Sequence, residues 1–158
     1  MPLTAERTFL DAGAAKLLPV LTPHGFDYVP RDSGVSSGGS FATSSFRRGA
    51  LEVGLIVRNG AVLGCPNYSV GQGFGGHDDL IASLGAAGRE KLISGPWPSF
   101  VGREGADAFE ALSADLEQII LPALTRSEAS FRRALAKAVQ EHQGRLGFGP
   151  RVSRGHSA

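Results

Sequence analysis

Apolar residues recur at helical spacing near the N-terminus. Between Thr4 and Leu21, every fourth position from Phe9 onwards is apolar or glycine, which places these positions on one face of a helix. Thr4 is the expected N-cap of this helix. Pro19 lacks a backbone N–H, so we expect it to kink the last turn or to end the helix near Leu18.

Alternation of apolar and polar residues replaces the helical pattern after this segment. Residues 51–58, LEVGLIVR, alternate strictly and form the clearest strand pattern in the chain. Asn59-Gly60 then predicts a two-residue hairpin turn with positive φ angles. The chain is expected to return as one strand over Ala61 to Val70. Further strands are predicted at Phe26 to Pro30 and Phe41 to Arg47, with a mobile Ser/Gly-rich stretch from Arg31 to Ser40 between them.

The C-terminal half is helical in pattern. A short helix is expected from His77 to Leu84, and a longer one from Asp107 to Leu121, which Pro122 should kink or end. Thr125 and Glu128 have capping-box spacing and predict the start of a last helix that runs to about Glu141.

The order of elements predicts an α+β fold, because the strands are clustered rather than alternating with helices. We expect an antiparallel four-stranded meander over residues 26–70, with the N-terminal helix and three C-terminal helices packed on one face. The other face, or an edge of the sheet, would then be available to a partner.

Composition is that of a single globular domain: 158 residues, of which 42% are hydrophobic and 20% charged. Residues 1–143 are expected to form this domain, and residues 144–158 a disordered basic tail that is too poor in apolar residues to build a core. The tail holds three of the 16 basic residues and none of the 15 acidic ones, which leaves the rest with a formal charge of 13 − 15 = −2. A slightly acidic body argues against nucleic-acid binding.

Several other classes are disfavoured by simple absences in the sequence. Cys65 is the only cysteine, so neither an intrachain disulfide nor a cysteine-based zinc site is expected. The first residues contain acids and no uninterrupted apolar stretch, which disfavours a secretory signal. No apolar run reaches the ~20 residues that span a bilayer. We therefore expect a cytoplasmic protein with no membrane, cofactor or metal partner.

Two glycine patterns resemble catalytic or cofactor motifs. Gly71–Gly76 fits G-x-G-x-x-G, but it follows a hairpin strand and precedes a helix of about two turns, unlike a dinucleotide-binding unit. We interpret it as a flexible glycine loop at the start of a helix. Gly34–Gly38 fits G-x-S-x-G, but no strand–helix junction surrounds it, so a hydrolase is disfavoured.

Histidine and tryptophan supply the other candidates. The four histidines are scattered, although His77 could join Asp78, Asp79 and Glu52 in a mixed site whose spacing favours no particular metal. Trp97 stands between two prolines and is either a plug over the core or an aromatic anchor for a partner.

The chain also resembles an uncharacterised family of small bacterial proteins over roughly residues 9–124. The segments that carry this resemblance are Ser40-Phe41-Ala42, Phe46-Arg47-Arg48-Gly49, Leu51-Glu52-Val53, Arg58, Tyr68, Gly76-His77-Asp78-Asp79-Leu80, Leu84-Gly85 and Asp115-Leu116. They follow the skeleton GF…F.RG…LE…R…G…Y…H…LG of that family. The resemblance implies no activity, and the strand meander between helices is also similar to bacterial immunity proteins and secretion chaperones.

The sequence thus favours a non-enzymatic protein-interaction module whose partner is another protein or a second copy of itself. The alternative is a small-molecule-binding protein or enzyme with a site near Tyr68, the Gly71–Gly76 loop and His77. No catalytic residue is predicted. The binding candidates are Arg58, Tyr68, His77, Asp78 and Trp97. We expect His77 and Arg58 to present solvent-facing polar heads, with Tyr68 either packed or exposed.

Overall fold

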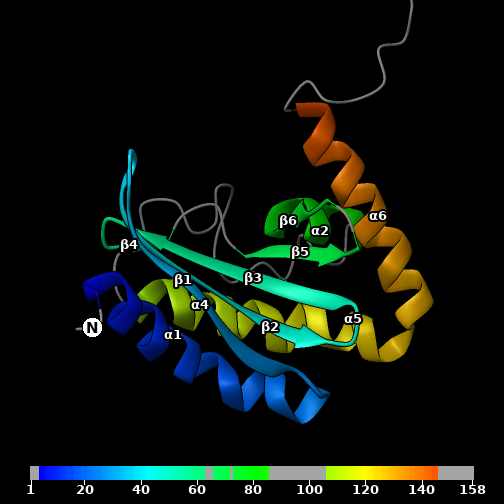
Figure 1. Cartoon of the computed structure of the whole chain (residues 1–158). Coiled ribbons are helices and arrows are strands. Elements are labelled where there is room, and N and C mark those ends of the chain that lie inside the picture. The colour runs from blue at the N-terminus through cyan, green and yellow to red at the C-terminus, as the bar shows by residue number, and fades with distance from the viewer. Residues whose placement is uncertain (1–3, 63–65, 72, 86–105, 146–158) are drawn as a thin grey trace, which may run out of the picture.

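The computed structural model describes residues 4–62, 66–71, 73–85 and 106–145 (Figure 1). Outside these residues lie Cys65, Trp97 and most of the segment predicted as a disordered tail. The described part has α+β architecture, with an N-terminal helix, an antiparallel sheet and C-terminal helices. Its elements are α1 (Ala5–Leu21), η1 (Thr22–His24), β1 (Asp27–Ser36), β2 (Gly39–Arg48), β3 (Leu51–Arg58), β4 (Ala61–Val62), β5 (Asn67–Val70), β6 (Gly75–Gly76), α2 (His77–Ser83), α4 (Ala106–Asp115), η2 (Leu116–Ile120), α5 (Leu121–Arg126) and α6 (Glu128–Arg145).

The sheet has more strands than the four expected. Its order is β1-β2-β3-β5-β6, and β4 is a two-residue strand paired with β3. The single strand expected over residues 61–70 is therefore divided into β4 and β5, which pair with opposite ends of β3. The Asn59-Gly60 turn is confirmed, with φ angles of 50° and 76°.

The Ser/Gly-rich stretch predicted to be mobile instead extends the β1–β2 hairpin to its tip at Ser36 and Gly39. The neighbouring β3–β4 turn holds this tip through side-chain hydrogen bonds. The Asn59 amide donates to Gly38 O and accepts from Ser40 N, each over 3.1 Å, and Arg58 Nη1 donates to Ser36 Oγ over 2.9 Å. These contacts are long-range in sequence, so local composition alone could not reveal them.

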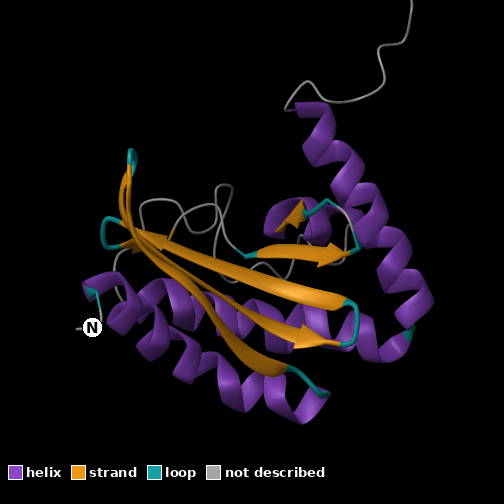
Figure 2. Cartoon of the chain, viewed as in Figure 1, coloured by secondary structure: helices purple, strands orange, loops and turns teal. Residues whose placement is uncertain are grey.

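Helices cover one face of the sheet (Figure 2). α1 packs against β1, β2 and β3 and lies beside α4, whereas α6 packs against α2, β5 and β6 at the other end. The strict alternation of β3 agrees with this arrangement, because its odd-numbered residues are buried and its even-numbered residues are partly exposed. The largest fully buried side chains of the core are Tyr68, Phe26, Phe46, Phe109, Phe131, Leu10, Leu17, Leu21, Leu80, Ile81, Leu112 and Leu116.

Two helices continue past prolines at which the sequence predicted either a kink or an end of the helix. α1 continues through Pro19 to Leu21, whose full burial holds the last turn against the sheet. The long C-terminal helix likewise continues past Pro122, which sits in the first turn of α5 directly after the π-helical turn η2.

The structure confirms one of the two predicted helix N-caps and places the other N-cap two residues further along the chain. Thr4 Oγ1 accepts from Arg7 N over 3.2 Å, as expected of the N-cap of α1. Ser127, not Thr125, caps α6, since its hydroxyl accepts from Ser130 N over 3.2 Å while Thr125 remains inside α5. α6 extends to Arg145, so its last two residues belong to the segment predicted as tail.

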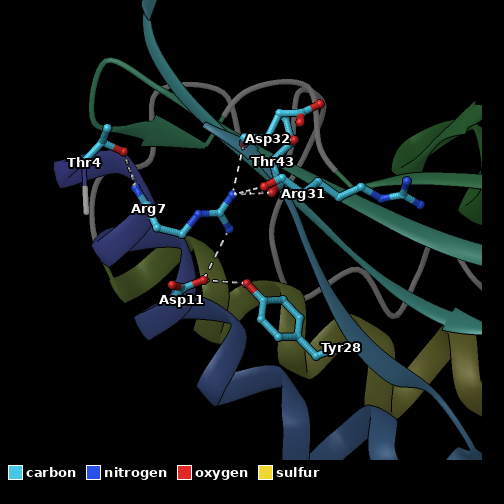
Figure 3. A network of polar contacts seen from close by, with 7 residues as sticks. All are labelled: Thr4, Arg7, Asp11, Tyr28, Arg31, Asp32 and Thr43. Atoms are coloured by element: carbon cyan, nitrogen blue, oxygen red, sulfur yellow. Dashed lines mark hydrogen bonds and ion pairs between the residues drawn. The ribbon is translucent and has the colours of Figure 1, made fainter. Parts of the chain in front are cut away.

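A buried arginine of α1 closes an irregularity in β1. The β1–β2 register shifts between Pro30 and Ser33, and Arg7 Nη2 donates there to the carbonyls of Arg31, Asp32 and Thr43 over 2.8, 3.0 and 2.8 Å (Figure 3). Only 5% of Arg7 is exposed. Because the β1–β2 register is irregular here and Pro30 has no N–H to offer, this part of the sheet edge is poorly suited to pairing with another strand.

The same arginine also contacts Asp11, which accepts a 2.7 Å hydrogen bond from the Tyr28 hydroxyl (Figure 3). Burial of the ring and the neighbouring Asp11 carboxylate raise the pKa of the Tyr28 phenol above its ordinary value.

Candidate functional site

Tyr68 and His77 come together in the structure with a third residue, Asp115. The Tyr68 hydroxyl is 2.9 Å from His77 Nδ1, and His77 Nε2 is 2.9 Å from Asp115 Oδ2. The tyrosine and histidine rings are stacked with centroids 5.8 Å apart. We call this group the buried relay, because hydrogen bonds run through it from β5 to α4.

Three elements position the buried relay. Tyr68 stands on the core side of β5 opposite Val53, His77 is the first residue of α2, and Asp115 is the last residue of α4 before η2. Their side chains are inaccessible: Tyr68 and Asp115 are 0% exposed and His77 3%. The expectation of a solvent-facing His77 is therefore wrong, because α2 turns this residue toward the core.

Sequence reasoning missed Asp115 as a member of this group, although a signal was present. Asp115 directly precedes Leu116 on the apolar side of the predicted helix, three positions after Leu112, and both leucines are buried. A carboxylate in such a position needs a buried hydrogen-bond donor, and a histidine outside the helix is a natural candidate.

The other candidates do not join the buried relay. Arg58 lies at the opposite end of β3 and on the opposite face, where its guanidinium stands 5.5 Å from the centre of the Phe41 ring. Asp78 is in the first turn of α2, next to His77. Trp97 lies outside the described residues. The five predicted residues thus do not form one patch within the described structure.

The glycine loop before α2 packs against α6. A Cβ at Gly75 would stand 2.9 Å from Ala138 Cβ, and a Cβ at Gly73 would stand 3.0 Å from a methyl group of Val139. Gly73 also has a φ of 82°, which side chains rarely adopt. The close approach of α6 and the positive φ of Gly73 therefore explain the presence of these glycines without a bound ligand.

Helix α2 also meets α6 through polar and aromatic contacts. His142 Nδ1 is 3.8 Å from Asp79 Oδ2, and the His142 ring lies 4.7 Å from the ring of Phe74. The described residues contain no group of three or more His, Cys, Asp or Glu side chains arranged to hold a metal ion.

A second polar cluster occupies the sheet face opposite α1 and α4, which we call the outer face. Arg31 Nη2 donates to both carboxylate oxygens of Glu52 over 3.0 and 2.9 Å, and Arg47 Nε lies 3.3 Å from Glu52 Oε2. These side chains remain partly accessible, with exposed fractions of 39% for Arg31, 50% for Arg47 and 26% for Glu52.

Beside this ion-pair cluster the outer face has a hollow of about 350 Å³. Gly54 has no side chain to fill it, while the Arg31–Glu52 pair and Asn67 stand around it. Its lining consists of Arg31, Thr43, Ser44, Glu52, Gly54, Leu55, Ile56 and Asn67.

Comparisons with known proteins give no relative from which a function could be inferred. The chain matches no protein-family model, no curated protein and no solved structure. Among the described helices, none combines the length and apolar character that crossing a membrane requires.

Proposed function

We propose that this chain is a non-enzymatic protein-interaction module that binds its partner with the outer face of the sheet. The observation that carries this proposal is the accessible Arg31–Glu52–Arg47 cluster beside the Gly54 hollow. An immunity-type or chaperone-like role would use such a surface.

The outer face combines features that suit protein recognition. Arginine is enriched among residues that dominate binding energies, because its planar guanidinium makes several directed hydrogen bonds. Partly exposed Ile56 and Phe41 add apolar area to the same face. In the described structure no helix packs over these strands on this side, whereas α1 covers their other side.

The alternative of a ligand or enzyme site near Tyr68, the glycine loop and His77 has weaker support. The buried relay brings together groups used in acid–base chemistry, but at most 3% of each residue is exposed. Proton transfer to a substrate requires approach within hydrogen-bond reach of the acid or base. Ligand screening by thermal shift tests this alternative, since a ligand at 100 times its Kd raises stability by about 2.7 kcal/mol.

Site-specific photo-crosslinking in cells of the native host tests the proposed function. A photoreactive amino acid is placed at Thr43 on the outer face and, as the matched control, at Leu18 on α1, which is 37% exposed. We expect a protein adduct from position 43 and none from position 18. The adduct from position 43 should disappear when Arg31 and Arg47 are both changed to Glu.

Two results would count against the proposed function. Equal adducts from both positions indicate nonspecific collision, and an adduct from position 18 alone places the interface on the helical layer. Circular dichroism of the Arg31→Glu/Arg47→Glu variant shows that loss of the adduct does not come from unfolding.

A further inference from the structure

Gly54 interrupts the most regular strand of the protein, yet the fold does not require a glycine there. Its φ lies outside the positive region, and a Cβ at this position would meet Asn67 O at 3.6 Å and Asn67 Cβ at 3.9 Å, which are ordinary van der Waals distances. Glycine within a strand weakens it, because its backbone loses more freedom on folding and no side chain packs. Gly54 is therefore expected to lower the stability of β3, although neither its backbone conformation nor its packing requires a glycine.

What Gly54 does provide is space. It lies on the outer face between Ser45 of β2 and Asn67 of β5, so only two short side chains flank this position across the sheet. The hollow of about 350 Å³ opens above Gly54, with Ile56 at one side and Glu52 at the other. Besides bulges and tight bends, glycine inside a strand often marks a site where a ligand or another backbone approaches closely.

The charged groups beside the hollow indicate what approaches. Arg31 uses Nε for Ser45 Oγ at 3.3 Å and Nη2 for Glu52, and Arg47 uses Nε for Glu52. The remaining guanidinium nitrogens, Nη1 of Arg31 and both terminal nitrogens of Arg47, bond to no other described residue. Arg47 stands opposite Asp27 in the register, but the described structure has no ion pair between these two.

Two guanidinium groups thus share one carboxylate and keep N–H donors for a second one. Carboxylates are the acceptors that match the guanidinium fork best. We propose that the Gly54 hollow and the Arg31–Arg47 pair together receive an acidic segment of a protein partner, which lies close over the backbone of β3 and directs an Asp or Glu side chain to the arginines. This inference rests on the proposed function and adds the contact point and the chemistry of the partner.

Peptide selection tests this inference without knowledge of the natural partner. A phage-displayed library of random linear peptides is selected against the full chain, and the affinities of the selected peptides are measured by fluorescence anisotropy. We expect the selected sequences to be enriched in Asp and Glu. Gly54→Leu should weaken their binding tenfold or more, because the side chain fills the hollow, and Arg31→Gln/Arg47→Gln should do the same.

Gly34→Leu is the matched control. Gly34 is also a strand glycine on the outer face, its φ is not positive, and a Cβ there would meet only Phe41 Cε1 at 3.9 Å. It lies outside the lining of the hollow, so peptide binding should equal that of the wild type. Thermal unfolding of both variants confirms that each is folded.

Several outcomes would overturn the inference. These are selected peptides without acidic enrichment, unchanged binding by Gly54→Leu, and free glutamate binding as tightly as the peptides, which would make the site one for small carboxylates. If Gly54→Leu fails to fold, Gly54→Ala is measured, and unfolding of this variant too would give the glycine a structural reason. Crosslinking at Thr43 separates the two proposals, because a specific adduct there alongside any of these outcomes leaves the proposed function intact.

Discussion

The two faces of the sheet carry polar clusters that resemble each other in composition and differ in access. On the core side, the buried relay joins a histidine to a carboxylate and a tyrosine with at most 3% of any residue exposed. On the outer face, Glu52 binds two arginines, and these three side chains are 26% to 50% exposed. The hydrogen bonding of the two clusters is similar, and their accessibility decides which of them another molecule can reach.

This difference in access also predicts how the clusters affect stability. Exposed ion pairs contribute about 0–1 kcal/mol, because water competes for the charges and the side chains lose freedom. A buried polar group that loses its partner is penalised by about 1–3 kcal/mol or more. Mutations in the buried relay should therefore change folding, and mutations on the outer face should change binding.

The largest expected effect is at Asp115. Asp115→Ala removes the acceptor of the 2.9 Å bond from His77 and leaves space at a fully buried position, so we expect a loss of about 3 kcal/mol in the free energy of unfolding. Urea denaturation measures it. Glu110→Ala is the control on the same helix, since within the described structure Glu110 forms a single, exposed ion pair with Lys16 and should change stability by about 0–1 kcal/mol. Similar losses in both variants would remove the distinction drawn between the two clusters.

Arg7 is an intermediate case, because it is buried but lies at the sheet edge. Arg7→Ala should lower the free energy of unfolding by about 2 kcal/mol, since three backbone carbonyls lose their shared donor at the β1 irregularity. Hydrogen exchange should show faster opening of β1 near Ser33 than of β3. Arg133→Ala, which removes an exposed arginine of α6 bonded to Ser130, is the control. Uniform acceleration of exchange throughout the sheet would show that Arg7 supports the whole fold rather than this edge.

The sequence was most informative where structure depends on neighbouring residues. The alternation of Leu51 to Arg58 and the Asn59-Gly60 turn were predicted correctly because hairpin geometry is determined locally. The hairpin tip was missed because Arg58 and Asn59 hold it from another hairpin. Of the two outcomes predicted at Pro19 and Pro122, a kink or an end of the helix, the end is wrong, because the helices continue past both prolines and bury Leu21 and Leu124 beyond them.

The candidate site was predictable only in part, for the same reason. The sequence names Tyr68 and His77 among its binding candidates, and the two side chains do lie in contact. The third member, Asp115, is 38 residues away from His77 in the chain, so only the tertiary fold brings it there. Gly54 and Arg31 carried no local signal, because the hollow is lined by residues of four strands, β1, β2, β3 and β5.

Two glycines on the sheet should respond to alanine with opposite signs. Gly75→Ala places a Cβ 2.9 Å from Ala138 in the fully packed contact with α6, so we expect a loss of about 1–2 kcal/mol. Gly54→Ala meets only ordinary contacts and reduces the freedom of the unfolded chain, so we expect a gain of about 0.5–1 kcal/mol. Urea denaturation of the two variants in parallel decides between these signs. A loss at Gly54 as large as that at Gly75 would mean that the fold needs both glycines, and the proposed contact point on the outer face would lose its support.

A last, pH-dependent effect concerns the half-buried Tyr28, which lies between the two extremes of access. Burial and the Asp11 carboxylate raise the pKa of Tyr28 in the folded protein above the ordinary 10.0, so the folded state keeps the phenolic proton at pH values where the unfolded state releases it. Because the folded state then binds more protons, the contribution of this group to stability is complete below about pH 10 and is lost as the pH rises through the folded pKa.

Tyr28→Phe has no proton to release and should lose stability less steeply above this pH, after a constant loss of about 1 kcal/mol from the missing hydrogen bond to Asp11. Urea denaturation at neutral pH and at several pH values above 10 measures both parts of this effect. Parallel pH profiles for wild type and Tyr28→Phe would mean that Asp11 and the partial burial of the ring do not favour the neutral phenol.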